Sequence, residues 1–433
     1  MTQIRRCRRL AIAVTVVGSM FCTGLTFTSR TAIAAELPST LPARVGLVAE
    51  RLARIDSVLE QYVTDGRIVG AATFILRRGS VVHNKAFGYR DREARDPMRR
   101  DSIFRIASHS KAIVSVGVMM LQEQGKLLIN DPVGKFLPEY MSTTVVQVNA
   151  QGDYDVVPAQ RRITIRDLLT HTAGINYGAG PAAAEWQAAQ IQGWYFAHRE
   201  EPIRETVRRI AELPFAAQPG SRFVYGYNTD ILGALIEVVS GEPLDVFLAK
   251  NIFEPLDMID THFYLPPEKR DRLAVVYSVA ADGTVTRTAD VSAMVGQGGY
   301  VDGPRQSFSG GAGLLSTPRD YGRFLQMMLN GGVLDGQRIL SRNTVKLMTV
   351  DHLRDVEFQP GQGFGLGFAI SKDVGARGVS GSVGEFSWGG AYHTTYWVDP
   401  LEELVVVYMT QLIPAGSLDD NAKLRALIYQ AIE

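Results

Sequence analysis

The apolar segment from Ala112 to Leu121 constrains the fold more than any other part of the chain. It carries no charged side chain, and a helix that is apolar on every side has to be buried. Gly125 follows at a position where helices commonly end. The sequence therefore predicts a buried core helix with Ser108 in its first turn, and the rest of the chain has to enclose it.

Ser108 and Lys111 form the only Ser-x-x-Lys pattern in the chain. Residues three positions apart share a helix face, so the Lys111 amine is expected beside the Ser108 hydroxyl. Backbone N–H groups in a first helical turn lack helical partners and favour negative charge. A base and an oxyanion donor beside a hydroxyl suit a serine nucleophile. The alternative is coincidence, because a chain of this length contains about one such spacing by chance.

A lysine amine has a reference pKa of about 10.4, so it needs burial, a neighbouring cation or a proton-sharing partner to act as a base near neutral pH. Tyr225 is the candidate partner. It lies in the segment 223–230, just before a helix predicted over residues 231–240. Loops that enter helices often display functional groups. The alternative is a half-buried core tyrosine.

The third candidate element is the stretch Trp388-Gly389-Gly390-Ala391, early in a predicted C-terminal strand. Paired glycines weaken a strand, but they suit a place where a substrate backbone approaches closely. A backbone N–H near Ala391 could then be a second oxyanion donor, opposite that of Ser108. The alternative is a β-bulge.

Both ends of the chain have β character, whereas the middle, from about 140 to 290, is mostly helical. Predicted strands cover residues 69–76, 81–89, 364–370, 387–400 and 404–411. Predicted helices outside the middle cover residues 52–62, 319–329 and 418–432. We therefore expect an α/β (α+β) fold, with one sheet built from both ends of the chain and a helical lobe inserted between them.

The first 35 residues are predicted to be a secretory signal peptide. Residues 5–9 are basic, residues 10–27 are mostly apolar, and Ala32-Ile33-Ala34 is a small-x-small cleavage pattern. A membrane anchor is the alternative, but glycine, serine and threonine interrupt the apolar run and no strong positive stop follows. We expect a periplasmic or secreted protein that is not inserted in a membrane after the signal is removed.

The composition argues against several classes of function. Lys+Arg and Asp+Glu both total 45, so there is no basic surplus for binding nucleic acid. No two of the seven histidines stand at metal-ligand spacing, and we expect neither a metal nor a cofactor. Both cysteines, Cys7 and Cys22, lie in the signal segment, so we expect no disulfide in the mature chain.

Together, a Ser-x-x-Lys at a helix start, a downstream tyrosine loop and a late glycine-rich strand resemble the serine β-lactamase and penicillin-binding superfamily. The likeness is closest to its class C-like branch, which includes the family VIII carboxylesterases. Residues 163–174, 309–317 and 397–400 also resemble that branch. The resemblance covers nearly all of residues 36–433, with its motifs in the expected order.

The resemblance implies a class C β-lactamase-like fold, in which an antiparallel sheet is flanked by helices and the site lies between two lobes. The sheet lobe would comprise residues of about 36–115 and 290–433, and the mostly helical lobe about 116–289. It also implies that Ser108 is the nucleophile, Lys111 its base and Tyr225 the proton shuttle.

The chain departs from the family pattern at the tyrosine. Many relatives carry Tyr-x-Asn, in which the asparagine holds a substrate amide. Here Tyr225 is followed by Gly226 and Tyr227, and Asn228 stands one place late. Binding of an amide or a β-lactam by this segment is therefore in doubt, and contact of Tyr227 or Asn228 with substrate stays open.

A second departure lies in the late strand. β-Lactamases carry Lys-Thr-Gly or Lys-Ser-Gly where this chain has Trp388, Gly389 and Gly390. The cation and the hydroxyl expected to hold a β-lactam carboxylate are therefore missing. An indole suits an apolar acyl or alcohol group, and Trp-Gly-Gly resembles the esterase version of the motif.

Three histidines lie near these motifs. His393, two residues after Ala391, could line the site or be structural. His109 points away from Ser108 and Lys111 on the predicted helix, and His171 is expected to support a loop. The fragment 380–384 is close to a Gly-x-Ser-x-Gly elbow but lacks the strand-to-helix context of that motif.

We therefore expect a secreted serine hydrolase that acts through an acyl-enzyme on small carboxylic esters. One alternative is a peptidase or amidase acting on D-residue peptides, linear oligopeptides or oligoamides. Others are a β-lactamase and a catalytically idle binding or sensor protein, although the presence of Ser108, Lys111 and Tyr225 argues against an idle site. The sequence does not indicate an oligomeric state.

Overall fold

The computed structural model of the protein describes residues 36–289 and 298–433. The predicted signal peptide, residues 1–35, lies outside the described residues. The described residues belong to one compact unit. Within the described part of the chain, every helix is too short or too polar to cross a lipid bilayer.

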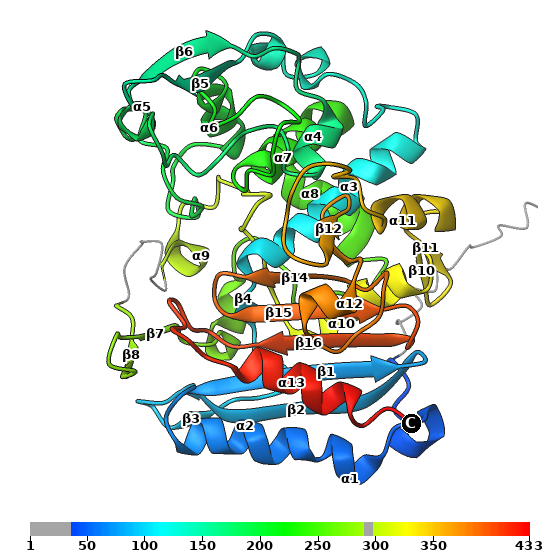
Figure 1. Ribbon diagram of the computed structural model, residues 1–433. Coiled ribbons are helices and arrows are strands. Elements are labelled where there is room, and N and C mark those ends of the chain that lie inside the picture. Colours follow the sequence, from blue (N-terminus) through cyan, green and yellow to red (C-terminus); the bar gives the residue numbers. More distant parts are fainter. Residues whose placement is uncertain (1–35, 290–297) are drawn as a thin grey trace, which may run out of the picture. The chain divides into compact units, whose positions relative to one another are not determined.

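An eight-stranded sheet, antiparallel at every pairing, is the central layer (Figure 1). In spatial order its strands are β12 (Gln362–Phe364), β13 (Ala369–Ser371), β14 (Phe386–Gly390), β15 (Thr394–Asp399), β16 (Leu404–Met409), β1 (Gly70–Arg77), β2 (Ser80–Asp91) and β3 (Asp96–Pro97). Strand β1 pairs with β16, and Ala72 lies opposite Met409. The prediction of one sheet built from both ends of the chain is confirmed.

Helices cover both faces of this sheet. Every residue of β1 and β16 is buried, because alternate side chains point to opposite faces. On one face, Ile75 shares a core with α2 (Arg54–Thr64) and α13 (Asp420–Tyr429). On the other face, Phe74 packs under α10 (Pro318–Leu329), where a Cβ on Gly322 would lie 2.5 Å from its ring. Gly322 therefore lets the helix approach the sheet closely.

The predicted core helix is α3 (Ser110–Glu123). It begins after a 3-10 turn, η2 (Ala107–His109), so Ser108 lies in that turn rather than in the α-helix itself. Residues 110–119 are all buried, and each fully buried large aliphatic side chain contributes about 1.5–3 kcal/mol. Gly125 has a φ of 69° beyond the helix end, as its predicted role in helix termination requires.

The middle of the chain packs around α7 (Asn228–Ser240), which contacts α3, α4, α6 and α8. The helices of this part are α4 (Ile165–Leu169), α5 (Ala183–Ala188), α6 (Ile203–Ile210) and α8 (Leu244–Leu248), followed by the π-helical turn η5 (Ala249–Phe253). Figure 1 shows them gathered beyond strand β14. The expectation of a mostly helical middle missed two hairpins, β5 (Thr144–Val148) with β6 (Tyr154–Pro158), and β7 (Tyr277–Val279) with β8 (Val285–Arg287).

Short elements connect these layers. They are η1 (Pro42–Val45), α1 (Ala49–Leu52), β4 (Phe104–Arg105), η3 (Val133–Lys135), η4 (Pro138–Met141), η6 (Pro267–Arg272), α9 (Gly299–Asp302), β9 (Leu315–Ser316), β10 (Val333–Leu334), β11 (Gln337–Arg338), α11 (Arg342–Met348) and α12 (Val374–Arg377).

Two predicted strands are hairpins in the structure. Residues 364–370 divide between β12 and β13, and residues 387–400 divide between β14 and β15. The second turn, residues 391–393, contains no Gly, Pro or Asn, which are the residues that usually mark a turn. His393 takes the left-handed conformation instead, with a φ of 62°.

The fully buried His109 makes stability sensitive to acid. Its ring lies between those of Tyr321 and Tyr396, with centroids 4.8 Å from each, and burial lowers the pKa of His109 to about 3. As the pH falls from about 6.5 to 3, the unfolded chain is protonated at this residue while the folded chain is not. The free energy of unfolding should then fall by about 1.4 kcal/mol per pH unit from this group alone.

We predict that His109→Phe removes this contribution, because phenylalanine keeps an aromatic ring but cannot be protonated. In urea unfolding, the stability of the variant relative to wild type should increase between pH 7 and pH 4.5. An equal stability difference at the two pH values would contradict the prediction.

Candidate active site

Ser108 stands out by its exposure. From residue 102 to residue 119 every residue is buried except Ser108, which is partly exposed. The preceding residue, Ala107, has a φ of 40°, which L-residues rarely adopt. Such strain persists only where the surroundings hold it in place, and it is concentrated at functional sites.

Neighbouring segments hold the approach to Ser108 in place. Strand β4 pairs with β9, and the Gln411 side chain pairs with the backbone of Arg105, accepting from its N–H (3.0 Å) and donating to its carbonyl (2.9 Å). After the turn, Ser110 Oγ accepts the Leu314 N–H at 3.0 Å. Ser108 is thus fixed between the end of β16 and residues 314–316.

Lys111 is 2% exposed, and its ammonium nitrogen makes three hydrogen bonds. It lies 3.2 Å from Ser108 Oγ, 3.1 Å from Tyr177 Oη and 2.7 Å from the Gly311 carbonyl oxygen. The predicted proximity of Lys111 to the Ser108 hydroxyl is therefore confirmed.

The geometry also suits a base at Lys111. A charged ammonium group has three donors, one for each acceptor. When Lys111 is neutral, its two remaining N–H groups can stay on Tyr177 and Gly311. Its lone pair is then directed at Ser108 Oγ, as general-base catalysis requires.

Tyr225 packs against Lys111 through its ring, whose centroid lies 4.6 Å from the Lys111 nitrogen. Its hydroxyl accepts a hydrogen bond from Trp388 Nε1 at 3.1 Å. The predicted loop position, directly before α7, is confirmed. Among the described residues, it is Tyr177 and not Tyr225 whose hydroxyl bonds to Lys111.

Tyr177 was not identified from the sequence. Burial raises the pKa of Tyr177 well above its ordinary value, so the hydroxyl is protonated at neutral pH and can accept from Lys111. The only signal in the sequence for a role of Tyr177 was its place three residues after Gly174, the residue that ends the segment 163–174. Nothing local distinguishes this tyrosine from others in the chain.

The end of β14 adjoins the turn that carries Ser108. A Cβ on Gly390 would lie 2.4 Å from the Ile106 carbonyl oxygen, so this glycine is needed for contact between two parts of the chain itself. A Cβ on Gly389, in contrast, would meet only Thr394 O, at the ordinary contact distance of 3.4 Å. The pairing of β14 with β15 is regular here, so the β-bulge alternative was wrong. Ala391 follows, exposed, in the hairpin turn.

An aromatic cluster surrounds Trp388. Its ring centroid lies 5.4 Å from that of Tyr225 and 5.2 Å from that of Phe364. Phe358 stacks on it with centroids 6.4 Å apart, and Phe223 packs on Phe358 at 4.6 Å. Of these five rings only Phe364 is fully buried, so the cluster offers apolar surface beside Tyr225.

Two other site candidates, Tyr227 and Asn228, lie away from this surface. Tyr227 is fully buried, donates to the Gly193 carbonyl and packs against the Tyr177 ring at 5.0 Å. Asn228 is also fully buried and donates to His171 Nδ1 at 2.9 Å. Contact of these two residues with substrate was left open by the sequence. In the structure the entry into α7 turns both side chains into the core, where they pack beneath Tyr177 and His171.

His393 and His171 both make contacts that support the fold around the site. His393 Nε2 bonds to Asp420 on α13 at 2.7 Å, so its ring is directed to the helix α13, which covers the other face of the sheet. Of the two roles that the sequence left open for His393, this contact supports the structural one. His171 packs on Tyr225 with ring centroids 4.7 Å apart, and burial together with the Lys111 charge lowers the pKa of His171 well below its ordinary value.

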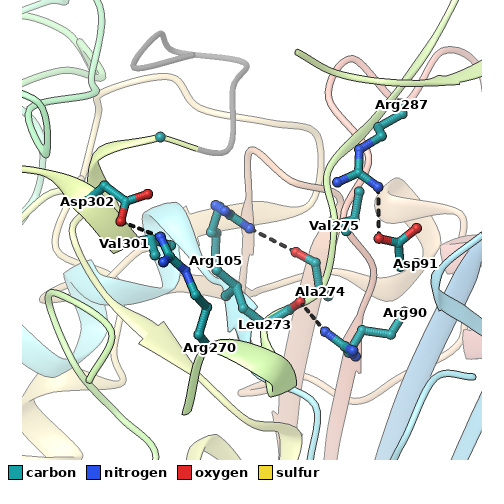
Figure 2. Close-up of a pocket in the computed structure, with 11 residues that line it drawn as sticks. Arg90, Asp91, Arg105, Arg270, Leu273, Ala274, Val275, Arg287, Val301 and Asp302 are labelled. Atoms are coloured by element: carbon teal, nitrogen blue, oxygen red, sulfur yellow. Dashed lines mark hydrogen bonds and ion pairs between the residues drawn. The ribbon is translucent and has the colours of Figure 1, made fainter. Parts of the chain in front are cut away.

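Figure 2 shows a separate pocket that is lined in part by Arg105 of β4. Its volume is about 420 Å³. It is lined by arginines, but Arg270 pairs with Asp302 and Arg287 pairs with Asp91. Arg105 donates to the Ala274 carbonyl at 2.8 Å. Because Ser108 and Lys111 do not line it, we do not place the reaction there. No set of three or more His, Cys, Asp or Glu side chains suited to a metal occurs in residues 36–289 and 298–433.

Comparison with known proteins places this chain in one family. The family model described as Beta-lactamase matches residues 55–430. Protein Rv1367c of Mycobacterium tuberculosis is 34% identical over 82% of this chain and 89% of its own length. Esterase EstB of Burkholderia gladioli is 31% identical over 85% of this chain and 92% of its own length.

A solved structure shows the same fold. EstCE1, a hydrolase with promiscuous acyltransferase activity, superimposes with a TM-score of 0.74 at 30% identity. The match covers 88% of this chain and 99% of that chain. A class C β-lactamase-like fold, with an antiparallel sheet flanked by helices, is thereby confirmed.

The contact between Tyr177 and Lys111 yields a prediction. Tyr177→Phe removes one of the three acceptors of Lys111, and a hydrogen bond to a charged group contributes about 1.5–3 kcal/mol. Misorientation of the amine should slow modification of Ser108 by a fluorophosphonate about 10- to 100-fold.

Tyr140→Phe is the matched control, since the buried Tyr140 hydroxyl donates to the Val207 carbonyl in the same part of the fold. The control variant should be labelled at the wild-type rate. Equal labelling rates for Tyr177→Phe and Tyr140→Phe would show that Tyr177 does not orient Lys111.

Proposed function

The chain belongs to the beta-lactamase family and is a serine hydrolase, and from this premise we propose that it cleaves small carboxylic esters through an acyl-enzyme on Ser108. The observation that carries the proposal is the triple anchoring of Lys111, 3.2 Å from a partly exposed serine hydroxyl.

The first half-reaction forms the acyl-enzyme. Neutral Lys111 takes the Ser108 proton while Oγ attacks the ester carbonyl. The N–H groups of Ser108 and Ala391 hold the developing oxyanion. The tetrahedral intermediate then expels the alkoxide, which takes a proton from Tyr225 as the C–O bond breaks. The proton held by Lys111 passes to Tyr225, so Lys111 is neutral again at the start of the second half-reaction.

The second half-reaction releases the acid. Neutral Lys111 takes a proton from the water that attacks the acyl carbonyl, and it returns this proton to Ser108 Oγ as the bond between Oγ and the acyl carbon breaks. Tyr177 and Gly311 keep the Lys111 nitrogen in place through both steps. Apart from the water molecule, the groups that act in these steps are side chains and backbone groups of this chain.

The substrate class follows from the surface beside Tyr225. The partly exposed rings of Trp388, Phe358 and Phe223 favour an apolar alcohol or acyl group over a carboxylate. The likeness to Esterase EstB points in the same direction. A peptidase or amidase acting on D-residue peptides, linear oligopeptides or oligoamides is the second candidate, because the same three residues can open an amide.

A β-lactamase ranks lower. The indole of Trp388 stands where the family motif places the lysine that pairs with a β-lactam carboxylate. A catalytically idle binding protein is set aside, because the chain is a serine hydrolase with the Ser108–Lys111 pair intact.

We predict that Ser108→Ala abolishes hydrolysis of a short-chain p-nitrophenyl ester, because the nucleophile is lost, while the unfolding midpoint stays close to that of wild type. The assay should be run beside a chromogenic cephalosporin, on which turnover should be slow or absent. Ester turnover retained by the variant would contradict the assignment, and rapid cephalosporin turnover would favour the β-lactamase.

Ser382→Ala is the matched control. Ser382 lies in the fragment 380–384, close to a Gly-x-Ser-x-Gly elbow, and it is 8% exposed. This variant should keep full ester turnover. Loss of turnover in Ser382→Ala, with activity retained in Ser108→Ala, would transfer the nucleophile to that fragment.

Export is part of the same proposal. Residues 1–35 carry a basic start, an apolar run and the Ala32-Ile33-Ala34 pattern, which together support a cleaved secretory signal. The enzyme would then act in the periplasm or outside the cell, and it would meet its esters there.

When the full chain is expressed in a bacterium with two membranes, we predict recovery of the enzyme from the periplasm or medium, with a new N-terminus close to residue 35. Ala34→Tyr should cause the uncleaved precursor to accumulate, because cleavage requires a small residue at that position. A cytosolic protein that retains Met1 would contradict the proposal.

A further inference from the structure

The glycine-rich segment 309–313 has no role in the mechanism beyond the single carbonyl of Gly311. It lies against the first turn of α7 with no space for side chains. A Cβ on Gly310 would lie 2.5 Å from the Thr229 carbonyl oxygen, and one on Gly311 would lie 2.5 Å from Asp230 Oδ2. The two glycines therefore let this segment reach the Asp230 carboxyl.

Asp230 holds the segment through two hydrogen bonds to one carboxyl oxygen. Its Oδ1 accepts from Ser309 Oγ at 2.6 Å and from the Gly311 N–H at 3.1 Å. Asp230 and Ser309 are 1% and 2% exposed, so water does not compete for these bonds.

The same contacts fix the peptide group that faces Lys111. The Ala312 N–H donates to Ser309 Oγ at 3.2 Å, while the carbonyl of the same peptide group, that of Gly311, accepts from Lys111 at 2.7 Å. A continuous chain of hydrogen bonds therefore runs from Asp230 through Ser309 and this peptide group to the Lys111 nitrogen.

Packing alone does not explain an aspartate at this position. Burial raises the pKa of the Asp230 carboxyl, which reflects the cost of placing it in the core. The bond from Ser309, the charge of Lys111 and the bond from Gly311 only partly offset that effect. An apolar residue would fill the space without this cost. What the carboxyl adds is one oxygen, Oδ1, that accepts two hydrogen bonds and is held in place at the start of a helix.

We propose that Asp230 is a positioning residue for catalysis: it fixes the peptide group between Gly311 and Ala312 and thereby directs the Lys111 lone pair at Ser108 Oγ. The inference rests on the proposed function, because it assigns Lys111 as the base. It also gives the glycine-rich segment a role, which is to bring a backbone carbonyl to the base without a side chain in between.

The test compares four variants of the enzyme. Asp230→Ala removes both acceptor positions, and misplacement of a catalytic group by about 1 Å costs about 100-fold in rate. We expect a loss of this order in kcat for a p-nitrophenyl ester and in fluorophosphonate labelling of Ser108, with KM unchanged because Asp230 does not contact substrate. Asp230→Asn keeps an amide oxygen at the Oδ1 position and should restore most of the rate.

Ser309→Ala is the milder variant, and it keeps the proposal testable if Asp230→Ala does not fold. It removes one hydroxyl and frees the Ala312 N–H, and we expect a loss of about fivefold in kcat. The matched control is Asp320→Ala. Asp320 is equally buried in the first turn of α10 and accepts from the Asp260 N–H at 2.7 Å. This variant should lose stability but keep the wild-type rate per folded molecule.

The outcomes separate this inference from the proposed function. Wild-type rates per folded molecule in Asp230→Ala or Ser309→Ala would overturn the positioning role, and so would an equal loss in Asp320→Ala. A wild-type protein that is labelled at a residue other than Ser108, or not at all, would overturn the proposed function itself.

Discussion

The anchoring of Lys111 by acceptors from three separate parts of the chain is the contact on which the rest of the site depends. Burial of an ammonium group is costly unless each of its donors has a partner. Ser108, Tyr177 and Gly311 provide those partners at 2.7–3.2 Å. They also set the direction of the nitrogen, which a single acceptor on a long flexible side chain does not achieve.

The sheet makes this convergence possible. Because β1 lies beside β16, the segment that leads to Ser108 meets the end of the last strand, and Gln411 pairs with the backbone of Arg105. The pairing of β4 with β9 brings the glycine-rich segment to the same place. The end of β14 closes this region where Gly390 meets the Ile106 carbonyl. The contacts of the buried Lys111 thus depend on a sheet that joins both ends of the chain.

Trp388 changes the chemistry that such a site favours. A lysine at this position would present a cation to an acidic substrate, whereas the indole donates one hydrogen bond, to Tyr225, and otherwise offers apolar surface. The Tyr225 ring lies against the Lys111 amine, and the Tyr225 hydroxyl accepts a hydrogen bond from Trp388. The aromatic cluster therefore extends as far as Lys111. In the proposed mechanism, this continuity places the apolar surface that would select the substrate beside the residues that would transfer protons.

The sequence by itself determined the features that depend on neighbours in the chain. Ser108 and Lys111 share a face because of their spacing, and the apolar run after them specified a core helix. The strand patterns at the two ends of the chain were sufficient to predict one sheet built from both. The turn at His393 was missed because no typical turn residue marks it.

Only the tertiary structure decided which distant groups complete the site. Tyr177 and Gly311 lie 66 and 200 residues from Lys111, so no local period connects them, and Asp230 acts through a peptide group that only packing brings near. The same packing turned Tyr227 and Asn228 inward. Spacing along the chain predicts the first turn of a helix, whereas the direction of a lone pair depends on how whole segments meet.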